Sequence, residues 1–434
     1  YWRRKDFDFI GLMLPAYARK GDALDCTLWY KGKSFDFAFP RVEDPSPAPL
    51  TINYKVPHGF NYIAPGMGAV TQNGRFDTFT ASPQGLYSKY SHCGYASGYD
   101  TVPFTTKSGL AVNFLKSEHI NKRNFKCYIP DEIYQPTIIG AFDYYNAFLG
   151  SPSAVFNFYV FPESESSAPG VVGIAQAACV SEGTMAALGG FHTLAGPLVA
   201  RQWFGPQMRP RTDRDIWIAE AMPLYLGAMY IKDSVGVGEF YSHIINRQDT
   251  FFTIADLGRD MPLASGSRGE PMCRFNKDFW VVHMLRFLMF DPATSSDQTF
   301  LKFVRDLALL TNMKLFTNND VIRLAEKHYG QKLDWFFDQW LYGHNYPDYD
   351  MRWGVNKADA GWSITCNARV GKVDSTFAMP VLIRISGVAG ESQTVRQFIS
   401  GASAEFTLGP FPFEPKDFHF NEYFGVLAKI NSSK

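Results

Sequence analysis

Two short aromatic segments, separated by a fixed interval, constrain the fold of this chain more than any other feature. They read Ala200-Arg201-Gln202-Trp203-Phe204-Gly205 and Trp217-Ile218-Ala219-Glu220-Ala221. Eighteen residues separate Arg201 from Glu220. Just before Arg201 stand Pro197 and Leu198, whose side chains carry no group that binds a metal or transfers a proton. The region therefore keeps residues suited to packing and has few residues suited to catalysis.

The two segments resemble the zinc-site region of the aminopeptidase N-type metallopeptidases, the gluzincin aminopeptidases. In that family a helix reading H-E-x-x-H-Q-W-F-G is followed by W-L-N-E-G, and eighteen residues separate the second His from the ligand Glu. In the same register the first His falls on Pro197, the general-base Glu on Leu198 and the second His on Arg201, while Glu220 is retained. The resemblance implies a degenerate, metal-free member of the family.

Two further family motifs have lost their functional side chains in this register. The G-A-M-E-N loop, whose Glu holds the free amino end of the substrate, falls on Gly173-Ile174-Ala175-Gln176-Ala177. Gln176 replaces the acid and stays a candidate for substrate binding through its amide. The Y-x-K-G motif, whose Tyr stabilises the tetrahedral intermediate, falls on Phe275-Asn276-Lys277-Asp278, so Phe275 supplies no hydroxyl. No catalytic residue is expected at these positions or at the former zinc-site positions.

The chemistry of a zinc site explains why these changes should abolish catalysis. Catalytic zinc needs about three protein ligands and an open position for water, whose pKa the metal lowers. Glu220 alone does not make such a site. Arg201 adds a permanent positive charge, and two unit charges 4 Å apart repel by roughly 4 kcal/mol at an effective dielectric constant of 20. We therefore expect no bound metal and no other cofactor.

Several expectations concern the residues that remain. We expect Arg201 and Glu220 to form an ion pair in the volume where zinc would lie. Restoring His, Glu and His at positions 197, 198 and 201 should rebuild a ligand set with Glu220. No two histidines of the chain are four residues apart, so the sequence contains no helical His pair of the kind that binds zinc. A site assembled from distant residues remains an alternative, and with it an aminopeptidase or other hydrolase that has a relocated or non-zinc site.

Composition narrows the class of partner. Lys plus Arg and Asp plus Glu both number 42, so the formal net charge is zero, and no long basic run marks a nucleic-acid interface. The most apolar stretch, Phe279 to Phe290, contains His283 and Arg286 and is shorter than the roughly twenty residues of a membrane span. It predicts a buried helix. We expect that a segment before Tyr1 is missing. Association with a membrane through that segment is an alternative that the sequence leaves open.

The pattern along the chain predicts an α+β multidomain protein. Residues 1–130 are expected to form an N-terminal β-rich domain, incomplete at its N-terminus, with strand-like runs such as Thr51 to Val56. Residues 131–348 match a thermolysin-like domain with α/β and helical parts, which includes a capped helix from Asn318 to Gly330. Residues 349–434 are expected to form a small C-terminal β-sandwich.

The functional expectation follows from a sequence that keeps the packing residues of the family and lacks its catalytic residues. We expect a catalytically inactive, aminopeptidase-like protein that acts as a binding, scaffold or accessory subunit for a protein or peptide partner. Fold alone does not give function. Besides the relocated hydrolase, the soluble part of a larger membrane-associated protein or complex is an alternative. Metal analysis distinguishes a metal-dependent hydrolase from an inactive binding protein. Native mass or co-purification shows whether the chain belongs to a larger complex.

Overall fold

The fold was analysed in a computed structural model of the chain. The structure describes residues 2–3, 10–11, 51–59, 61–63, 68–81, 94–96, 99–117, 131–152, 155–161, 171–174, 177–181, 191–205, 208–265, 271–312 and 314–434. The chain divides into two compact units, Tyr1–Ala38 and Phe39–Lys434. In the first unit, strands β1 (Trp2–Arg3) and β2 (Ile10–Gly11) pair antiparallel.

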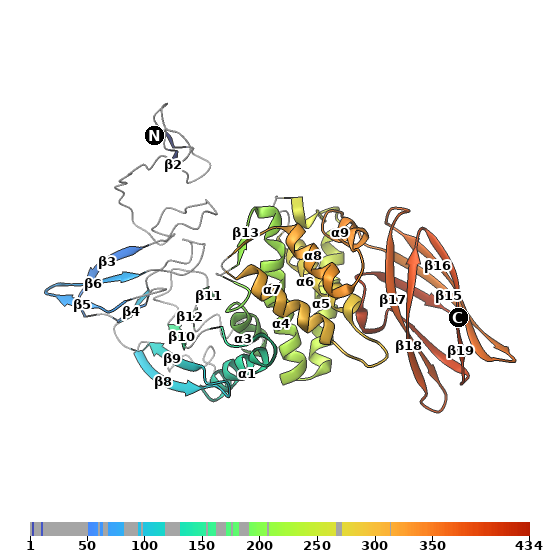
Figure 1. The fold of residues 1–434 in the computed structure, drawn as a ribbon, viewed down its shortest axis with the longest axis horizontal. Coiled ribbons are helices and arrows are strands. Elements are labelled where there is room, and N and C mark those ends of the chain that lie inside the picture. Colours follow the sequence, from blue (N-terminus) through green and yellow to red (C-terminus); the bar gives the residue numbers. More distant parts are fainter. Residues whose placement is uncertain are drawn as a thin grey trace. The chain divides into compact units, whose positions relative to one another are not determined.

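The N-terminal part of the second unit is rich in β strands (Figure 1). Strands β3 (Ile52–Pro57), β6 (Phe76–Ala81) and β5 (Thr71–Asn73) form one antiparallel sheet, and β4 (Asn61–Ile63) pairs with β7 (Gly94–Ala96). Tyr54 of β3 stacks on Phe79 of β6 with ring centroids 4.7 Å apart. Both rings are buried, so this cross-strand pair fixes which face of the sheet is covered.

A second sheet has the order β11-β12-β10-β9-β8. Its strands are β8 (Tyr99–Thr105), β9 (Ala111–Ser117), β10 (Val155–Phe161), β11 (Val171–Ile174) and β12 (Ala177–Ser181). Strand β10 runs parallel to β9, which requires a crossover. Helix α1 (Asp131–Leu149) lies on the chain between these two strands and packs on the sheet, with Phe142 and Phe156 ring centroids 4.8 Å apart.

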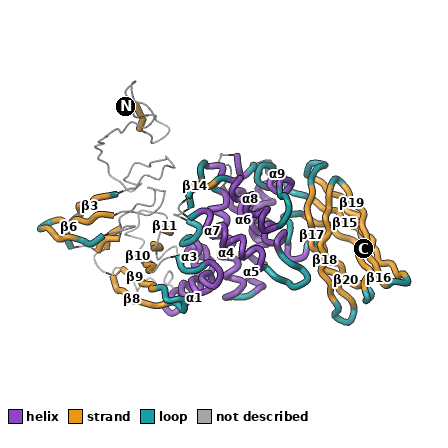
Figure 2. The backbone as a smooth tube through the Cα atoms, in the orientation of Figure 1, coloured by secondary structure: helices purple, strands orange, loops and turns teal. Residues whose placement is uncertain are grey.

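The middle of the chain is helical (Figure 2). The helices are α3 (Phe191–Ala200), α4 (Trp217–Ser234), α5 (Val237–Ala255), α6 (Pro271–Met289), α7 (Gln298–Thr311), α8 (Asn318–Tyr329) and α9 (Asp334–Trp340). Short 3-10 turns cover Asp213–Asp215 and Leu263–Ser265, and β13 (Arg209–Pro210) runs parallel to β14 (Leu315–Phe316).

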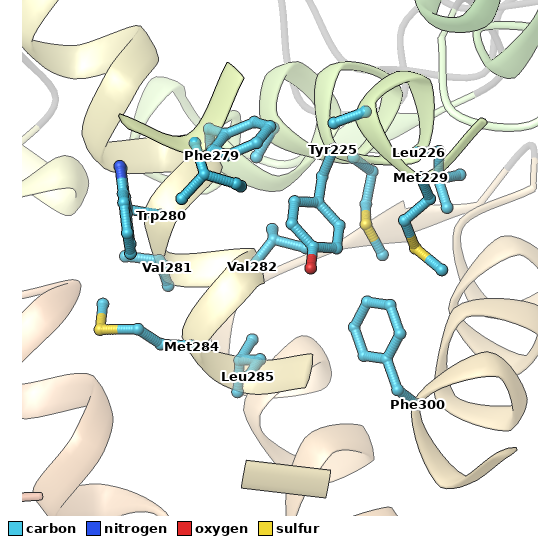
Figure 3. Close-up of a cluster of buried hydrophobic side chains, with 14 of the residues drawn as sticks. Tyr225, Leu226, Met229, Phe279, Trp280, Val281, Val282, Met284, Leu285 and Phe300 are labelled. Atoms are coloured by element: carbon cyan, nitrogen blue, oxygen red, sulfur yellow. The ribbon is translucent and has the colours of Figure 1, made fainter. Parts of the chain in front are cut away.

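Helix α6 is the centre of this helical region. Every residue from Asn276 to Met289 is buried, which confirms the buried helix predicted from the apolar stretch. Figure 3 shows how its side chains meet those of α4 and α7. The ring of Tyr225 lies 5.1 Å from that of Phe279 and 5.9 Å from that of Phe300. This core holds α4 and α6 in a fixed relation, and both helices carry predicted site residues.

Helices α3 and α4 cross in very close contact. A side-chain carbon placed on Gly227 would lie 2.4 Å from Cδ of Pro197, and one placed on Gly196 would lie 2.8 Å from Cα of Gly227. Real carbon atoms do not approach so closely, so both glycines are needed for this crossing. Pro197, which the predicted register aligns with the first family His, thus packs against α4.

Gly227→Ala should therefore lower the free energy of unfolding by about 1–3 kcal/mol, the usual cost of overpacking a core. Gly238→Ala is the matched control, because an added carbon on the exposed Gly238 meets no atom within 4 Å. The control should raise stability slightly, by up to about 1 kcal/mol, since Ala favours a helix more than Gly does. Urea denaturation compares the two variants, and equal midpoints would contradict the close crossing.

The C-terminal part contains two β sheets. One has the order β19-β16-β15-β21, with β15 (Asp348–Ala358), β16 (Gly361–Gly371), β19 (Ser403–Phe411) and β21 (Lys429–Ser433). The other has the order β18-β17-β20, with β17 (Ala378–Gly387), β18 (Ser392–Ser400) and β20 (Pro415–Phe420), followed by a 3-10 turn at Glu422–Phe424. Tyr349 and Phe420 pack one sheet on the other, with ring centroids 5.2 Å apart.

The predicted mixed α+β class is confirmed, with a β-rich N-terminal part, a central helical region and C-terminal β sheets. The predicted domain boundaries at residues 130 and 348 stay a prediction.

Candidate functional site

A pocket of about 490 Å³ lies where the turn after α3 meets α4, α5 and the first turns of α6. Its lining consists of Arg201, Gly205, Met208, Pro210, Ile216, Ala219, Glu220, Leu224, Arg247, Met272, Phe275 and Asn276. Three residues singled out from the sequence, Arg201, Glu220 and Phe275, thus line one pocket. The structure brings together what the eighteen-residue spacing and the motif register predicted to be close.

Other predicted positions lie elsewhere. Leu198 is buried in the core with 1% of its surface exposed, and Pro197 contacts Gly227. Neither residue lines the pocket. Gln176 lies outside the residues that the structure describes, so its predicted role in substrate binding stays a prediction.

Backbone geometry fixes Arg201 at the pocket wall. Its amide donates a hydrogen bond to the carbonyl of Pro197, which extends α3 by one residue. A side-chain carbon on Gly205 would come within 2.3 Å of the Arg201 carbonyl oxygen, so the chain turns away from α3 as tightly as it does only with glycine there. This explains why Gly205 accompanies the aromatic segment in the sequence.

The prediction that Arg201 and Glu220 form an ion pair is wrong. Among the described residues, Glu220 is paired with Arg274 instead: Nη2 of Arg274 lies 3.6 Å from Oε2 of Glu220. Nε of the same arginine lies 3.6 Å from Oδ2 of Asp278, one helical turn further along α6. The reason is geometric, because α6 packs against α4 and one guanidinium there reaches two carboxylates.

These three side chains form the Glu220–Arg274–Asp278 cluster. Asp278 is its most deeply buried member. Its side chain is fully buried, and neither of its oxygens has a hydrogen-bond partner among the described residues. Burial raises the pKa of this carboxyl well above its ordinary range; the charge of Arg274 opposes the rise, and that of Glu220 adds to it. The sequence signal for the cluster was the four-residue spacing of Arg274 and Asp278, which lies on one helix face.

Arg247 of α5 contributes a second cation to the pocket lining. Its Nη1 donates to Oδ1 of Asn276 at 3.2 Å, and its guanidinium lies 4.5 Å from the centre of the Phe279 ring. Burial lowers the pKa of Arg247 to about 10, so the group is charged at neutral pH. Within the described part of the chain, neither Arg247 nor Arg201 forms an ion pair with a carboxylate. No motif pointed to Arg247, because it comes from a helix that carries none.

The remaining motif residues on α6 divide between two environments. Phe275 lies at the pocket with 40% of its surface exposed and offers no hydroxyl. Lys277 is fully buried; its Nζ donates to both carboxylate oxygens of Asp260 at 2.9 and 3.0 Å and to the carbonyls of Met261 and Gly343. Lys277 therefore ties α6 to the loop that precedes it and to the loop after α9, and it does not line the pocket.

The residues present do not fit zinc. Glu220, which the predicted register aligns with a zinc ligand, lies 3.6 Å from a guanidinium, and the other ligand positions of that register carry Pro197 and Arg201. Across the described ranges, no three His, Cys, Asp or Glu side chains gather as a metal-ligand set. The arrangement instead offers a pocket lined by two arginines, Arg201 and Arg247, and an apolar wall.

Comparison with known proteins supports the fold. The chain is similar to the crystal structure of Legionella pneumophila aminopeptidase A in complex with aspartic acid, with a TM-score of 0.64 over 89% of this chain. The fold is aminopeptidase-like. Sequence identity is 12% and the match spans only 44% of the length of that protein, so the likeness concerns the fold alone. No protein-family profile and no curated protein sequence matches the chain.

One further finding concerns membranes. None of the helices that the structure describes combines the length and the hydropathy needed to cross a bilayer.

Proposed function

We propose that this chain is a catalytically inactive, aminopeptidase-like protein whose pocket holds a protein or peptide partner, so that it acts as a binding or accessory subunit. The observation that carries the proposal is the ion pair between Glu220 and Arg274. It supplies the positive charge that the retained carboxylate would otherwise receive from a metal. Nη2 of Arg274 and Oε2 of Glu220 are 3.6 Å apart and share no hydrogen bond, but the guanidinium compensates the carboxylate charge without a metal.

The substitutions at the other positions support the same conclusion. Peptide hydrolysis by this fold family relies on a metal-activated water and on a hydroxyl that stabilises the tetrahedral intermediate. Pro197 and Leu198 supply no ligand or base, and Phe275 supplies no hydroxyl. The pocket itself has a volume of about 490 Å³, large enough for an amino-acid side chain and its neighbours. A pocket without catalytic groups can still bind a ligand, which is why we propose binding without turnover.

The purified protein should hold only substoichiometric zinc after incubation with excess zinc and desalting, and it should release no amine from aminoacyl reporter substrates. Metal content is measured by mass spectrometry and hydrolysis by fluorescence. Glu220→Ala serves as the matched control, because zinc held at the surface is unaffected by it. Stoichiometric zinc that is lost in Glu220→Ala, or chelator-sensitive hydrolysis, would refute the proposal and favour a hydrolase.

A further inference from the structure

The pocket contains more positive than negative charge. Arg201 and Arg247 both line it, and within the described residues neither has a carboxylate partner. The acid at the pocket surface, Glu220, is engaged by a third arginine, Arg274. The other acid nearby, Asp278, is fully buried and shares the same arginine. Two guanidinium groups are thus left for a ligand.

Partial burial makes this surplus charge significant. Arg201 and Arg247 are both half-buried, so each guanidinium loses part of its solvation energy, and a paired anion restores it. Arg247 is additionally fixed by its hydrogen bond to Asn276 and by its position over the Phe279 ring. A guanidinium held in one orientation binds an anion with little loss of side-chain entropy, and its planar fork matches a carboxylate. The pocket is therefore organised before any ligand arrives.

The rest of the lining restricts the anion. Met272, Phe275 and Leu224 present apolar surface beside the arginines, so the ligand is expected to combine a charge with an apolar group. Glu220 also lines the pocket and disfavours a second negative charge, which makes a carboxylate a better match than a phosphate dianion.

We infer that this pocket binds a peptide through a carboxylate placed at Arg201 and Arg247, with an adjoining apolar side chain on the Met272–Phe275 wall. The inference rests on the proposed function and names the chemical class of the partner. It also reverses the polarity implied by the family resemblance, in which an acid holds the free amino end of a peptide.

Four small probes separate the alternatives. N-acetyl-leucine carries a free carboxyl terminus and an apolar side chain, whereas N-acetyl-leucinamide lacks the charge and leucinamide carries an amine instead. N-acetyl-aspartate α-amide carries its carboxylate on the side chain and so distinguishes an internal acidic residue from a chain end. We expect N-acetyl-leucine or the aspartate probe to bind at least about tenfold more tightly than the two amides of leucine, the usual effect of a hydrogen bond to a charged group.

Variants of the protein locate the binding. Arg201→Met and Arg247→Met should each weaken carboxylate binding by about ten- to a hundredfold. Arg211→Met is the matched control, since it removes the same charge from an exposed position outside the pocket. Its affinity should stay within about twofold of wild type, because solvent screens exposed charges. Arg201→Met keeps the test valid if Arg247→Met, which loses a core contact, fails to fold.

Calorimetry or ligand-observed NMR measures all affinities. The inference would be overturned if leucinamide bound more tightly than the carboxylates, or if all probes bound equally. It would also be overturned if inorganic phosphate displaced the bound probe at a lower concentration than N-acetyl-leucine does, or if Arg211→Met lost as much affinity as the pocket variants. If the probes do not bind as expected and the protein neither binds zinc nor hydrolyses the reporter substrates, the inference is wrong and the proposed function still stands. Zinc-dependent hydrolysis would instead refute the proposed function itself.

Discussion

Lys277→Met is expected to lower the free energy of unfolding by about 3–5 kcal/mol, because it leaves a buried carboxylate without its counter-ion. Lys277 is fully buried, Asp260 has 5% of its side chain exposed, and Nζ lies 2.9 Å from Oδ1. Asp260 would keep one hydrogen bond, from the amide of Asn345 at 2.8 Å. That bond does not neutralise its charge. Chemical denaturation of wild type and variant measures the difference.

The pair between Lys332 and Glu326 provides a matched control. It has the same separation of 2.9 Å, but Lys332 has 78% of its side chain exposed. Lys332→Met should therefore change stability little, since water solvates the exposed ammonium group and Glu326 keeps the hydrogen bond that it accepts from the Leu333 amide at 3.1 Å. The double variant Lys277→Met with Asp260→Leu should recover a large part of the loss, because no unpaired charge remains. If the double variant is no more stable than Lys277→Met alone, the stranded charge is not the cause of the loss.

Local signals made parts of this fold predictable from sequence. Helix α8 shows why: Thr317 and Asp320 form a reciprocal capping box, and Gly330 ends the helix with a φ of 84°. The signals that start and stop this helix are local in the sequence, so the pattern contains them. It placed the cap at Asn318, whereas the N-cap residue in the structure is Thr317. Strand β17 is similar, since its apolar run from Met379 to Ile385 lies inside Ala378–Gly387.

The ion-pair partner of Glu220 was not predictable in this way. The motif register correctly suggested that Arg201 and Glu220 share a small volume, because packing residues preserve the frame. Which cation reaches Glu220 depends on how α6 packs against α4, and that information is spread over many core contacts. Arg274 therefore escaped notice despite standing next to Phe275.

Stoichiometric zinc binding is expected when Arg274→Met is combined with Pro197→His, Leu198→Glu and Arg201→His. The sequence alone suggested that the last three changes suffice. The structure adds Arg274, which holds the carboxylate that must become a ligand. Removing it frees Glu220 at the pocket that Arg201 also lines. Pro197 lies one helical turn before Arg201 and packs against Gly227, so a histidine there has to turn from α4 toward the pocket. With that rotamer, two histidines and one carboxylate form the set that a catalytic zinc site uses.

The variant that retains Arg274 is the matched control. It should bind no stoichiometric zinc, because a guanidinium 3.6 Å from Glu220 competes for the carboxylate and repels the dication. Adding Glu220→Gln to the four-residue variant should weaken zinc binding by at least about a hundredfold, since even an outer-shell partner contributes about ten- to a hundredfold. Circular dichroism checks folding, because Leu198 is buried and a glutamate there needs the metal as counter-charge. Equal zinc affinity with and without Arg274 would show that the Glu220–Arg274 pair does not keep zinc out of this pocket.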